Sequence, residues 1–162
     1  MVALAIMSVM LVIGLPSYSA WIANTQIRAA AEATLNGMQL ARAEAVRRNV
    51  NVEFVFGATS AWTVREAAAG TVVQTRGAGQ GSTGVTVVRT PAAATIVTFN
   101  SLGRVVANAG GTATLTQADF DVAVARLAAS SSRNLRVVVN AGGNVRMCDP
   151  TVTDVTDPRI CT

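Results

Sequence analysis

No charged residue occurs between Met1 and Ile27, and this uncharged start constrains the fold more than any other feature of the chain. Its first part, Met1–Leu15, is almost continuously apolar. A helix of that length rises only about 22 Å, which is less than the roughly 30 Å of a bilayer's hydrocarbon core. Extension through Tyr18 and Trp21 supplies the missing length and places two aromatic rings where membrane meets water. We therefore expect residues 1–25 to anchor the chain in a membrane.

A cleaved secretory signal is the alternative interpretation of this segment. Such a signal begins with a positively charged region and ends at a small-residue cleavage site, followed by a change in composition. The sequence shows neither feature, so a retained anchor is favoured.

The apolar pattern continues beyond the uncharged segment with the spacing of a helix. From Ile27 to Ala45, apolar residues recur at steps of three and four, and the opposite face carries arginine and glutamate. This spacing predicts an amphipathic part of the same helix over residues 26–49. Proline lacks the backbone N–H that a helix uses, so we expect the helix to be bent or broken at Pro16.

After Asn49 the spacing of apolar residues changes from the period of a helix to the period of a strand. Apolar residues occupy every second position from Val50 to Phe56, which predicts a half-buried strand. Further short strands are predicted at Trp62–Glu66, Thr71–Arg76, Val85–Thr90, Thr95–Asn100, Arg104–Ala107, Leu135–Asn140 and Asn144–Cys148. The segment Asp119–Ala129 fits either a short helix or an edge strand. The fold class is therefore α+β, with a long N-terminal helix followed by a small antiparallel, sandwich-like β-domain over residues 50–162.

The residue types missing from the chain exclude most catalytic chemistry. There is no histidine, and all 13 basic residues are arginine. The chain thus lacks the commonest general base and metal ligand, and also the lysine of Schiff-base and P-loop chemistry. Ser130–Ser132 offers hydroxyl groups but no positioned base. We expect neither enzymatic activity nor a cofactor or metal.

Cys148 and Cys161 are the two cysteines, and both lie near the end of the chain. No second pair and no histidine accompanies them to complete a zinc site. A disulfide is the simpler interpretation, and two buried thiols in a cytosolic protein are the alternative. The disulfide requires an oxidising compartment such as the bacterial periplasm, and it stabilises the fold by roughly 3 kcal/mol.

Three segments form an ordered series along the chain: the helix end Leu40–Asn49, the strand and turn Phe99–Arg104, and the hairpin Val137–Cys148. In order and in layout they resemble the GspH/FimT branch of the type IV pilin superfamily. The resemblance implies a minor pilin or pseudopilin, a structural subunit that assembles into a type IV pilus or a type II secretion system filament.

The processing motif of that family is missing here. A Gly followed by Phe-Thr-Leu-Ile-Glu precedes the apolar run in the family, whereas this sequence starts at Met1-Val2-Ala3-Leu4, and we expect a truncated start. The resemblance implies a single-pass protein of the bacterial inner membrane with a periplasmic domain, whose partners are other pilins bound through the N-terminal helix. A helix that is apolar on all sides leaves lipid only if similar helices replace the lipid contacts. A simple anchor for a periplasmic domain is the alternative.

DNA binding is the second functional hypothesis. Some relatives in the FimT branch capture DNA with a C-terminal Gly-Arg-x-Arg motif, and the matching segment Gly143–Arg146 lacks the first arginine. The candidate DNA contacts are arginines with no carboxylate between them in the sequence: Arg126, Arg133, Arg136 and Arg146. Three aspartates follow in the tail, so we expect any DNA affinity to be weak and strongly salt-dependent.

Overall fold

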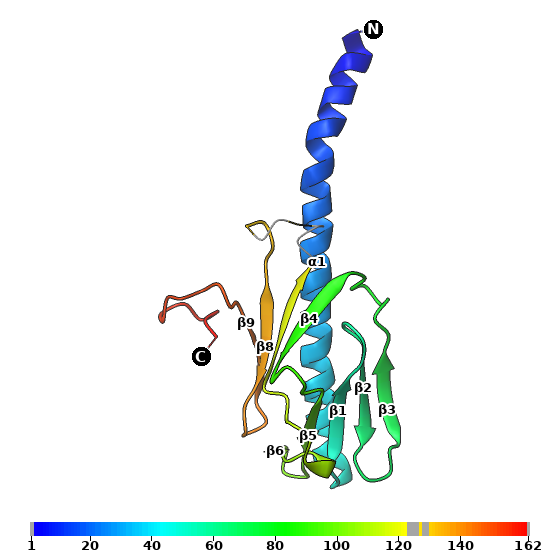
Figure 1. Cartoon of the computed structure of the whole chain (residues 1–162), viewed down its shortest axis with the longest axis vertical. Helices are drawn as coiled ribbons and strands as arrows, with labels where there is room; N and C mark the ends of the chain where they lie inside the picture. The colour runs from blue at the N-terminus through cyan, green and yellow to red at the C-terminus, as the bar shows by residue number, and fades with distance from the viewer. Residues whose placement is uncertain (1, 123–126, 128–129, 162) are drawn as a thin grey trace.

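The computed structural model describes residues 2–122, 127 and 130–161, with side chains described from Tyr18 onward except that of Val122. A single long helix, α1 (Val2–Arg48), runs along the molecule, and its N-terminal part extends beyond a domain built from β-strands (Figure 1). The predicted anchor, residues 1–25, lies mostly outside the residues whose side chains are described.

No helix within the described residues is long and apolar enough to cross a membrane.

α1 is continuous across Pro16, so of the two predicted outcomes, a bend or a break, the break is wrong. Proline removes one backbone hydrogen bond from the helix, and the hydrogen bonds of the neighbouring turns suffice to continue it. The helix ends at Arg48, one residue before the predicted end. Asn49 follows with a φ of 55°, and the N–H of Val50 donates to the carbonyl oxygen of Ala45 at 3.3 Å. This pairing across a left-handed residue is a Schellman cap, which asparagine tolerates better than most side chains do.

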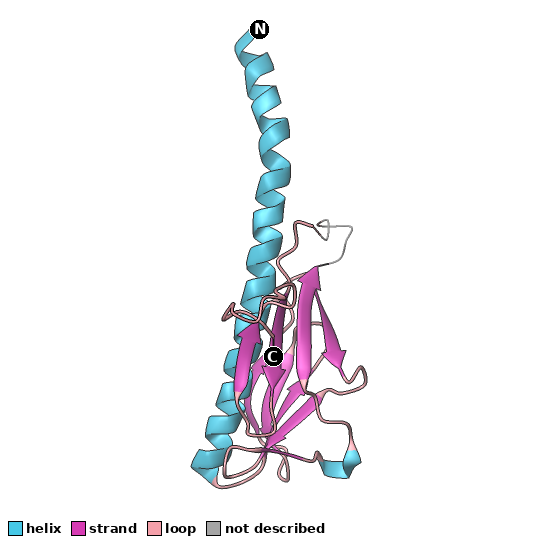
Figure 2. Ribbon diagram, turned by 90° about the vertical axis from the view of Figure 1, so that its left-hand side faces the viewer, coloured by secondary structure: helices cyan, strands magenta, loops and turns pink. Residues whose placement is uncertain are grey.

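The strands form two antiparallel sheets that both pack on α1 (Figure 2). One sheet has the order β3-β2-β1-β5-β6 and the other has the order β4-β7-β8-β9. The first sheet comprises β1 (Val52–Phe56), β2 (Trp62–Glu66), β3 (Val72–Arg76), β5 (Ile96–Phe99) and β6 (Val105–Val106). The second comprises β4 (Val85–Thr90), β7 (Gln117–Val122), β8 (Leu135–Val139) and β9 (Val145–Cys148). A short 3-10 helix, η1 (Ala109–Gly111), lies between β6 and β7.

This arrangement confirms the α+β fold class and all eight of the predicted strands. β2 and β4 have the predicted ends, and the other predicted strands differ by one or two residues at an end. The segment Asp119–Ala129, predicted as a short helix or an edge strand, begins as a strand but not at an edge, because β7 pairs with β4 on one side and with β8 on the other. Residues 123–126 and 128–129 lie outside the described part of the chain.

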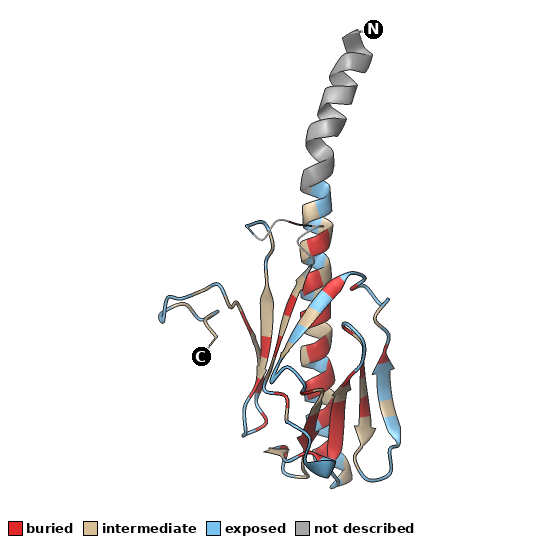
Figure 3. Cartoon of the chain, viewed as in Figure 1, coloured by how far each residue is buried: buried red, intermediate tan, exposed pale blue. Residues whose placement is uncertain are grey.

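One face of α1 contributes to a continuous hydrophobic core that the helix shares with both sheets (Figure 3). Its buried side chains recur at helical spacing and are mostly small: Ala23, Ile27, Ala30, Ala31, Thr34, Met38, Ala41 and Ala45. Small side chains let the sheets approach the helix closely. Gly37 marks the closest approach, because a Cβ atom there would lie 2.9 Å from Phe54 and 3.0 Å from Trp62.

Candidate assembly surfaces

Three surfaces of the domain carry features beyond those the fold requires. The first is the sector of α1 where the helix leaves the β-domain. The second is the junction of the segments Leu40–Asn49, Phe99–Arg104 and Val137–Cys148, and the third is the C-terminal loop. Of the arginines proposed for DNA, Arg136 and Arg146 lie on a fourth region, the outer face of the β8–β9 hairpin.

The first surface is the sector of α1 around Tyr18 and Trp21. These side chains are 62% and 64% exposed, and their rings stack with centroids 6.0 Å apart. Burial begins immediately afterwards at Ala23, which is 3% exposed. An aromatic pair exposed to water costs free energy, so this sector is suited to a partner or to a membrane interface.

Asn24 fixes the point at which the helix meets the domain. Its side-chain amide donates to the carbonyl oxygen of Ser131 at 3.1 Å, and its side-chain oxygen accepts from the N–H of Arg133 at 2.8 Å. One side chain thus ties α1 to the segment just before β8. These two hydrogen bonds lie two residues before Gln26, where the amphipathic part of the helix is predicted to begin.

The second surface is the junction of Leu40–Asn49, Phe99–Arg104 and Val137–Cys148, which meet at one end of the domain. Arg42 donates from Nε to the carbonyl oxygen of Gly103 at 3.1 Å. Gly143 lies against the same carbonyl group, because a Cβ atom at Gly143 would be 1.8 Å from that oxygen. The three segments that suggested a family are therefore a single packing unit in space.

Two turns of the same construction form this junction. Asn100 and Asn140 each begin a turn in which the side-chain oxygen accepts from the N–H four residues later, at 3.0 Å in both. Gly103 and Gly143 occupy the fourth position with φ values of 72° and 78°, a region that favours glycine. The sequence signal is the repeated Asn-x-x-Gly pattern, which the sequence analysis did not identify.

At the end of α1, charged side chains connect the helix to the first sheet. Glu44 pairs with Arg47 at 2.7 Å and with Arg48 at 2.6 Å, and Arg48 also pairs with Glu66 of β2 at 2.6 Å. The hydrogen bonds from Arg47 and then Arg48 lower the pKa of Glu44 from 4.5 to about 2. Glu44 and Arg48 thus interact as the i,i+4 spacing suggests, and Glu66 extends the pair into a small network.

The third surface is the C-terminal loop, residues 149–161, which a Cys148–Cys161 disulfide closes. The predicted disulfide is present, and both cysteines of the chain take part in it. The N–H of Asp149 also donates to the carbonyl oxygen of Arg159 at 2.8 Å, which closes the base of the loop a second time.

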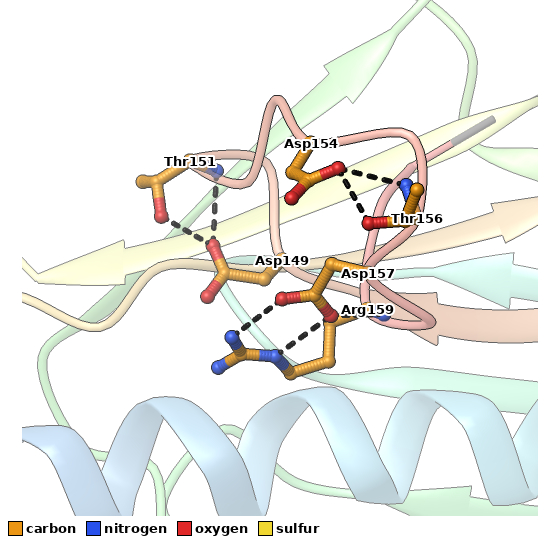
Figure 4. Close-up of polar contacts among 6 residues, drawn as sticks. All are labelled: Asp149, Thr151, Asp154, Thr156, Asp157 and Arg159. Carbon is orange, nitrogen blue, oxygen red and sulfur yellow. Dashed lines mark hydrogen bonds and ion pairs between the residues drawn. The ribbon is translucent and has the colours of Figure 1, made fainter.

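Three aspartates stiffen this loop in the same way (Figure 4). Each accepts, on one carboxylate oxygen, a hydrogen bond from the backbone N–H two residues later, at 2.9 Å in all three cases. The aspartates are Asp149, Asp154 and Asp157. These local bonds replace backbone freedom with fixed turns. No group of three potential metal ligands occurs among the described residues.

The arginines proposed for DNA do not form one free patch. Arg126 lies outside the described residues. Arg136 is paired with Asp119 of the neighbouring strand β7, through bonds of 2.5 Å and 3.1 Å. Arg136 and Arg146 share the outer face of the β8–β9 hairpin. Arg146 lies opposite Val138, and Val138 points to the same side of β8 as Arg136 because the two are two residues apart. Arg133 is exposed two residues before β8 begins, beside Asn24.

The pairing of Arg136 with Asp119 could not be seen from the sequence between Arg126 and Arg146, which contains no carboxylate. The sheet register supplies the missing charge, since Asp119 lies directly opposite Arg136. The outer face of this sheet is consequently less positive than the sequence suggests.

Comparison with known proteins agrees with this architecture. A family model for the type II transport protein GspH matches residues 30–143, more than half of the chain, and the chain therefore belongs to the GspH family. No curated protein matches the chain significantly. The chain is thus a GspH pseudopilin or minor pilin, of a type II secretion system or a type IV pilus, and its family is structural and not enzymatic.

Two crystal structures of the type IV minor pilin FimU from Pseudomonas aeruginosa PAO1 are similar to this chain. Both have a TM-score of 0.54, with sequence identities of 16% and 17%. The similarity covers 74% and 75% of this chain, and 90% and 87% of the FimU chains. At this level of identity the likeness supports the fold, and the family match confirms the relationship that the three segments predicted.

Membership of the pilin family implies a precursor anchored in the inner membrane and assembly with other pilins into a filament.

Proposed function

We propose that this chain enters its filament through the exposed sector of α1, and that residues 1–25 hold it in the inner membrane as a single span before assembly. The β-domain then faces the periplasm. The observation that carries this proposal is the exposure of Tyr18 and Trp21 at the point where α1 leaves the domain. Their burial between helices supplies a free energy of about 1.5 to 3 kcal/mol for each side chain.

Two further features support the same arrangement. The disulfide requires an oxidising compartment, which the periplasm provides. The domain covers only one face of α1, so the opposite face remains for neighbouring subunits (Figure 3). A structural role needs no catalytic site.

The test replaces both Tyr18 and Trp21 with glutamate in the full chain. The β-domain should keep its unfolding temperature, because neither side chain belongs to its core, whereas incorporation into filaments should fall by at least about tenfold. Val88→Glu is the matched control, since Val88 is 63% exposed but lies on β4. If the double variant assembles as well as the control, the proposal fails.

DNA binding is the second proposal, and it rests on Arg136 and Arg146 lying on one face of the β8–β9 hairpin. Because Asp119 competes for Arg136, Asp119→Asn should strengthen binding to duplex DNA at low salt, and Arg146→Ala should weaken it. Two phosphate contacts give a salt slope near 2, so affinity should fall about tenfold between 50 and 200 mM salt. If neither substitution changes the affinity, this face does not contact DNA.

A further inference from the structure

A pocket lies between α1 and the segment that precedes β8, at the end of the domain from which the N-terminal part of the helix projects (Figure 1). Its volume is about 360 Å³. The charged residues of its lining are three arginines and one aspartate: Arg28, Arg133, Arg159 and Asp149. Guanidinium groups that converge on one pocket favour a ligand with anionic oxygen atoms.

Arg133 is the arginine of this pocket that has no carboxylate partner. Its side chain is exposed and forms no ion pair with the described residues. Its backbone N–H donates to the side-chain oxygen of Asn24 at 2.8 Å, which fixes this part of the chain against α1. All five N–H groups of the Arg133 guanidinium are therefore available to a ligand.

Arg28 brings a second set of donors to the same place, because it lies one helical turn after Asn24. It donates to Glu32 from Nε at 2.7 Å, and its two terminal nitrogens bond to no described residue. This pair is exposed on both sides, and pairs of this kind contribute only about a twofold preference. Glu32 is thus a weak competitor for the Arg28 guanidinium.

The other two charged groups of the lining are occupied with each other and with the C-terminal loop. Arg159 pairs with Asp157 at 2.7 Å, and its carbonyl oxygen accepts from the N–H of Asp149. Asp149 also accepts two hydrogen bonds from Thr151 on Oδ1. The donors that remain for a ligand are therefore those of Arg28 and Arg133, on the side of the pocket next to α1.

The position of this site along α1 indicates where the anionic oxygens come from. Trp21 is exposed, as is Arg28, which lies seven residues later and so about 10 Å further along the helix. The headgroup layer of one leaflet is about 5 to 8 Å thick. Side chains on a helix tilt toward its N-terminus, and an arginine extends its charged end toward the interface. With Trp21 at the membrane interface, Arg28 and Arg133 reach the phosphates of the headgroups.

The apolar part of the lining fits the same source. Leu135 and Met147 line the pocket, and both are only partly buried. A free phosphate ion makes no use of such side chains, whereas the glycerol unit of a phospholipid can pack on them.

We propose that this pocket binds the headgroup of an anionic phospholipid, with the phosphodiester between Arg28 and Arg133. This inference rests on the proposed function, because it requires residues 1–25 to lie in the membrane. It adds a contact that holds the β-domain in one orientation on the membrane surface before the chain enters a filament.

Lipid retention by the full chain tests the site. The chain, purified in a mild detergent, is mixed with equal amounts of phosphatidylglycerol and phosphatidylcholine, and the retained lipid is identified by native mass spectrometry. The chain should retain phosphatidylglycerol in preference to phosphatidylcholine. Arg133→Gln should lower this retention about fivefold, the effect of one arginine at an anionic surface. The variant keeps the backbone N–H that bonds to Asn24, so its fold should not change.

Arg104→Gln is the matched control. Arg104 is also exposed but precedes β6, at the opposite end of the domain, so its loss should leave the retention unchanged (Figure 1). Glu32→Gln should raise the retention about twofold, because Arg28 loses its competing carboxylate. A merely structural role of the two arginines would not give changes of opposite sign.

Three results would overturn the site. The first is equal retention of phosphatidylglycerol by the parent chain and Arg133→Gln, and the second is equal retention of the two lipids by the parent chain. The third is release of the lipid by an excess of inorganic phosphate, which would make free phosphate the ligand.

Flotation with phosphatidylglycerol vesicles distinguishes failure of the site from failure of the proposed function. The parent chain and Arg133→Gln should both float, because residues 1–25 insert without the pocket. If both float but retain the lipid equally, the site is wrong and the anchor stands. If the parent chain does not float, the proposed anchor fails and the lipid site fails with it.

Discussion

Gly143 holds two turns together, and its replacement by alanine should be among the most damaging single changes in the domain. Two costs combine at this position. Alanine at a φ of 78° costs about 1 to 2 kcal/mol, because the left-handed region places Cβ close to the backbone. The added methyl group would also lie 1.8 Å from the carbonyl oxygen of Gly103, far inside normal contact.

That carbonyl group cannot move away alone. The N–H of Gly103 donates to the carbonyl oxygen of Asn100 at 2.8 Å, and Arg42 donates to the Gly103 oxygen itself. The two turns must therefore separate, which breaks the bond from Arg42 and the 3.1 Å bond from the N–H of Val105 to the oxygen of Ala141. Two such bonds contribute about 2 to 4 kcal/mol together, one of them being charge-assisted.

Gly110→Ala is the matched control for the backbone cost. Gly110 has a φ of 74°, and nothing lies within 4 Å of the position its Cβ would take. This variant should lose only the backbone term. Thermal unfolding of the full chain in detergent, followed by circular dichroism, should show Gly143→Ala melting about 4 to 16 °C below Gly110→Ala. If the two variants melt at the same temperature, the packing of the two turns does not stabilise the domain as argued.

Three further predictions concern the disulfide, the domain boundary and acid stability. Thiol labelling of the unreduced, denatured chain should find no free cysteine, and reduction should cost about 3 kcal/mol; two labelled thiols would contradict this. A fragment that begins at Ala20 should be about 2 kcal/mol more stable in urea than one that begins at Gln26, because only the longer one keeps the two hydrogen bonds of Asn24; equal midpoints would place the boundary elsewhere. The hydrogen bonds that lower the pKa of Glu44 stabilise the folded state above pH 4.5, and this stability is lost as the pH falls toward 2. Glu44→Gln should therefore flatten the dependence of the free energy of unfolding on pH between 4.5 and 2. An unchanged profile would show that Glu44 is not tied to Arg47 in solution.

The sequence predicts the regular elements well because each depends on local spacing. Buried Val52, Phe54 and Phe56 alternate along β1, and the buried alanines of α1 recur at steps of three and four. β7 was ambiguous because it alternates for only a few residues. Its identity as a strand comes from pairing with β4 and β8, which are distant in the sequence.

The surfaces could be predicted only in part, because they depend on contacts between distant segments. The disulfide followed from the composition, since there is one pair of cysteines. The neutralisation of Arg136 by Asp119 depends on sheet register, and the pocket between Arg28 and Arg133 depends on how the segment before β8 meets α1. Neither relationship leaves a pattern in the linear sequence.

Photocrosslinking from position 21 of the full chain in its native membrane, with the partner identified by mass spectrometry, tests the central claim most directly. If α1 carries the chain into a filament, the partner should be a pilin-like subunit, and the crosslink should map to the N-terminal helix of that subunit. Crosslinks to lipid alone, or to a protein without such a helix, would contradict the account.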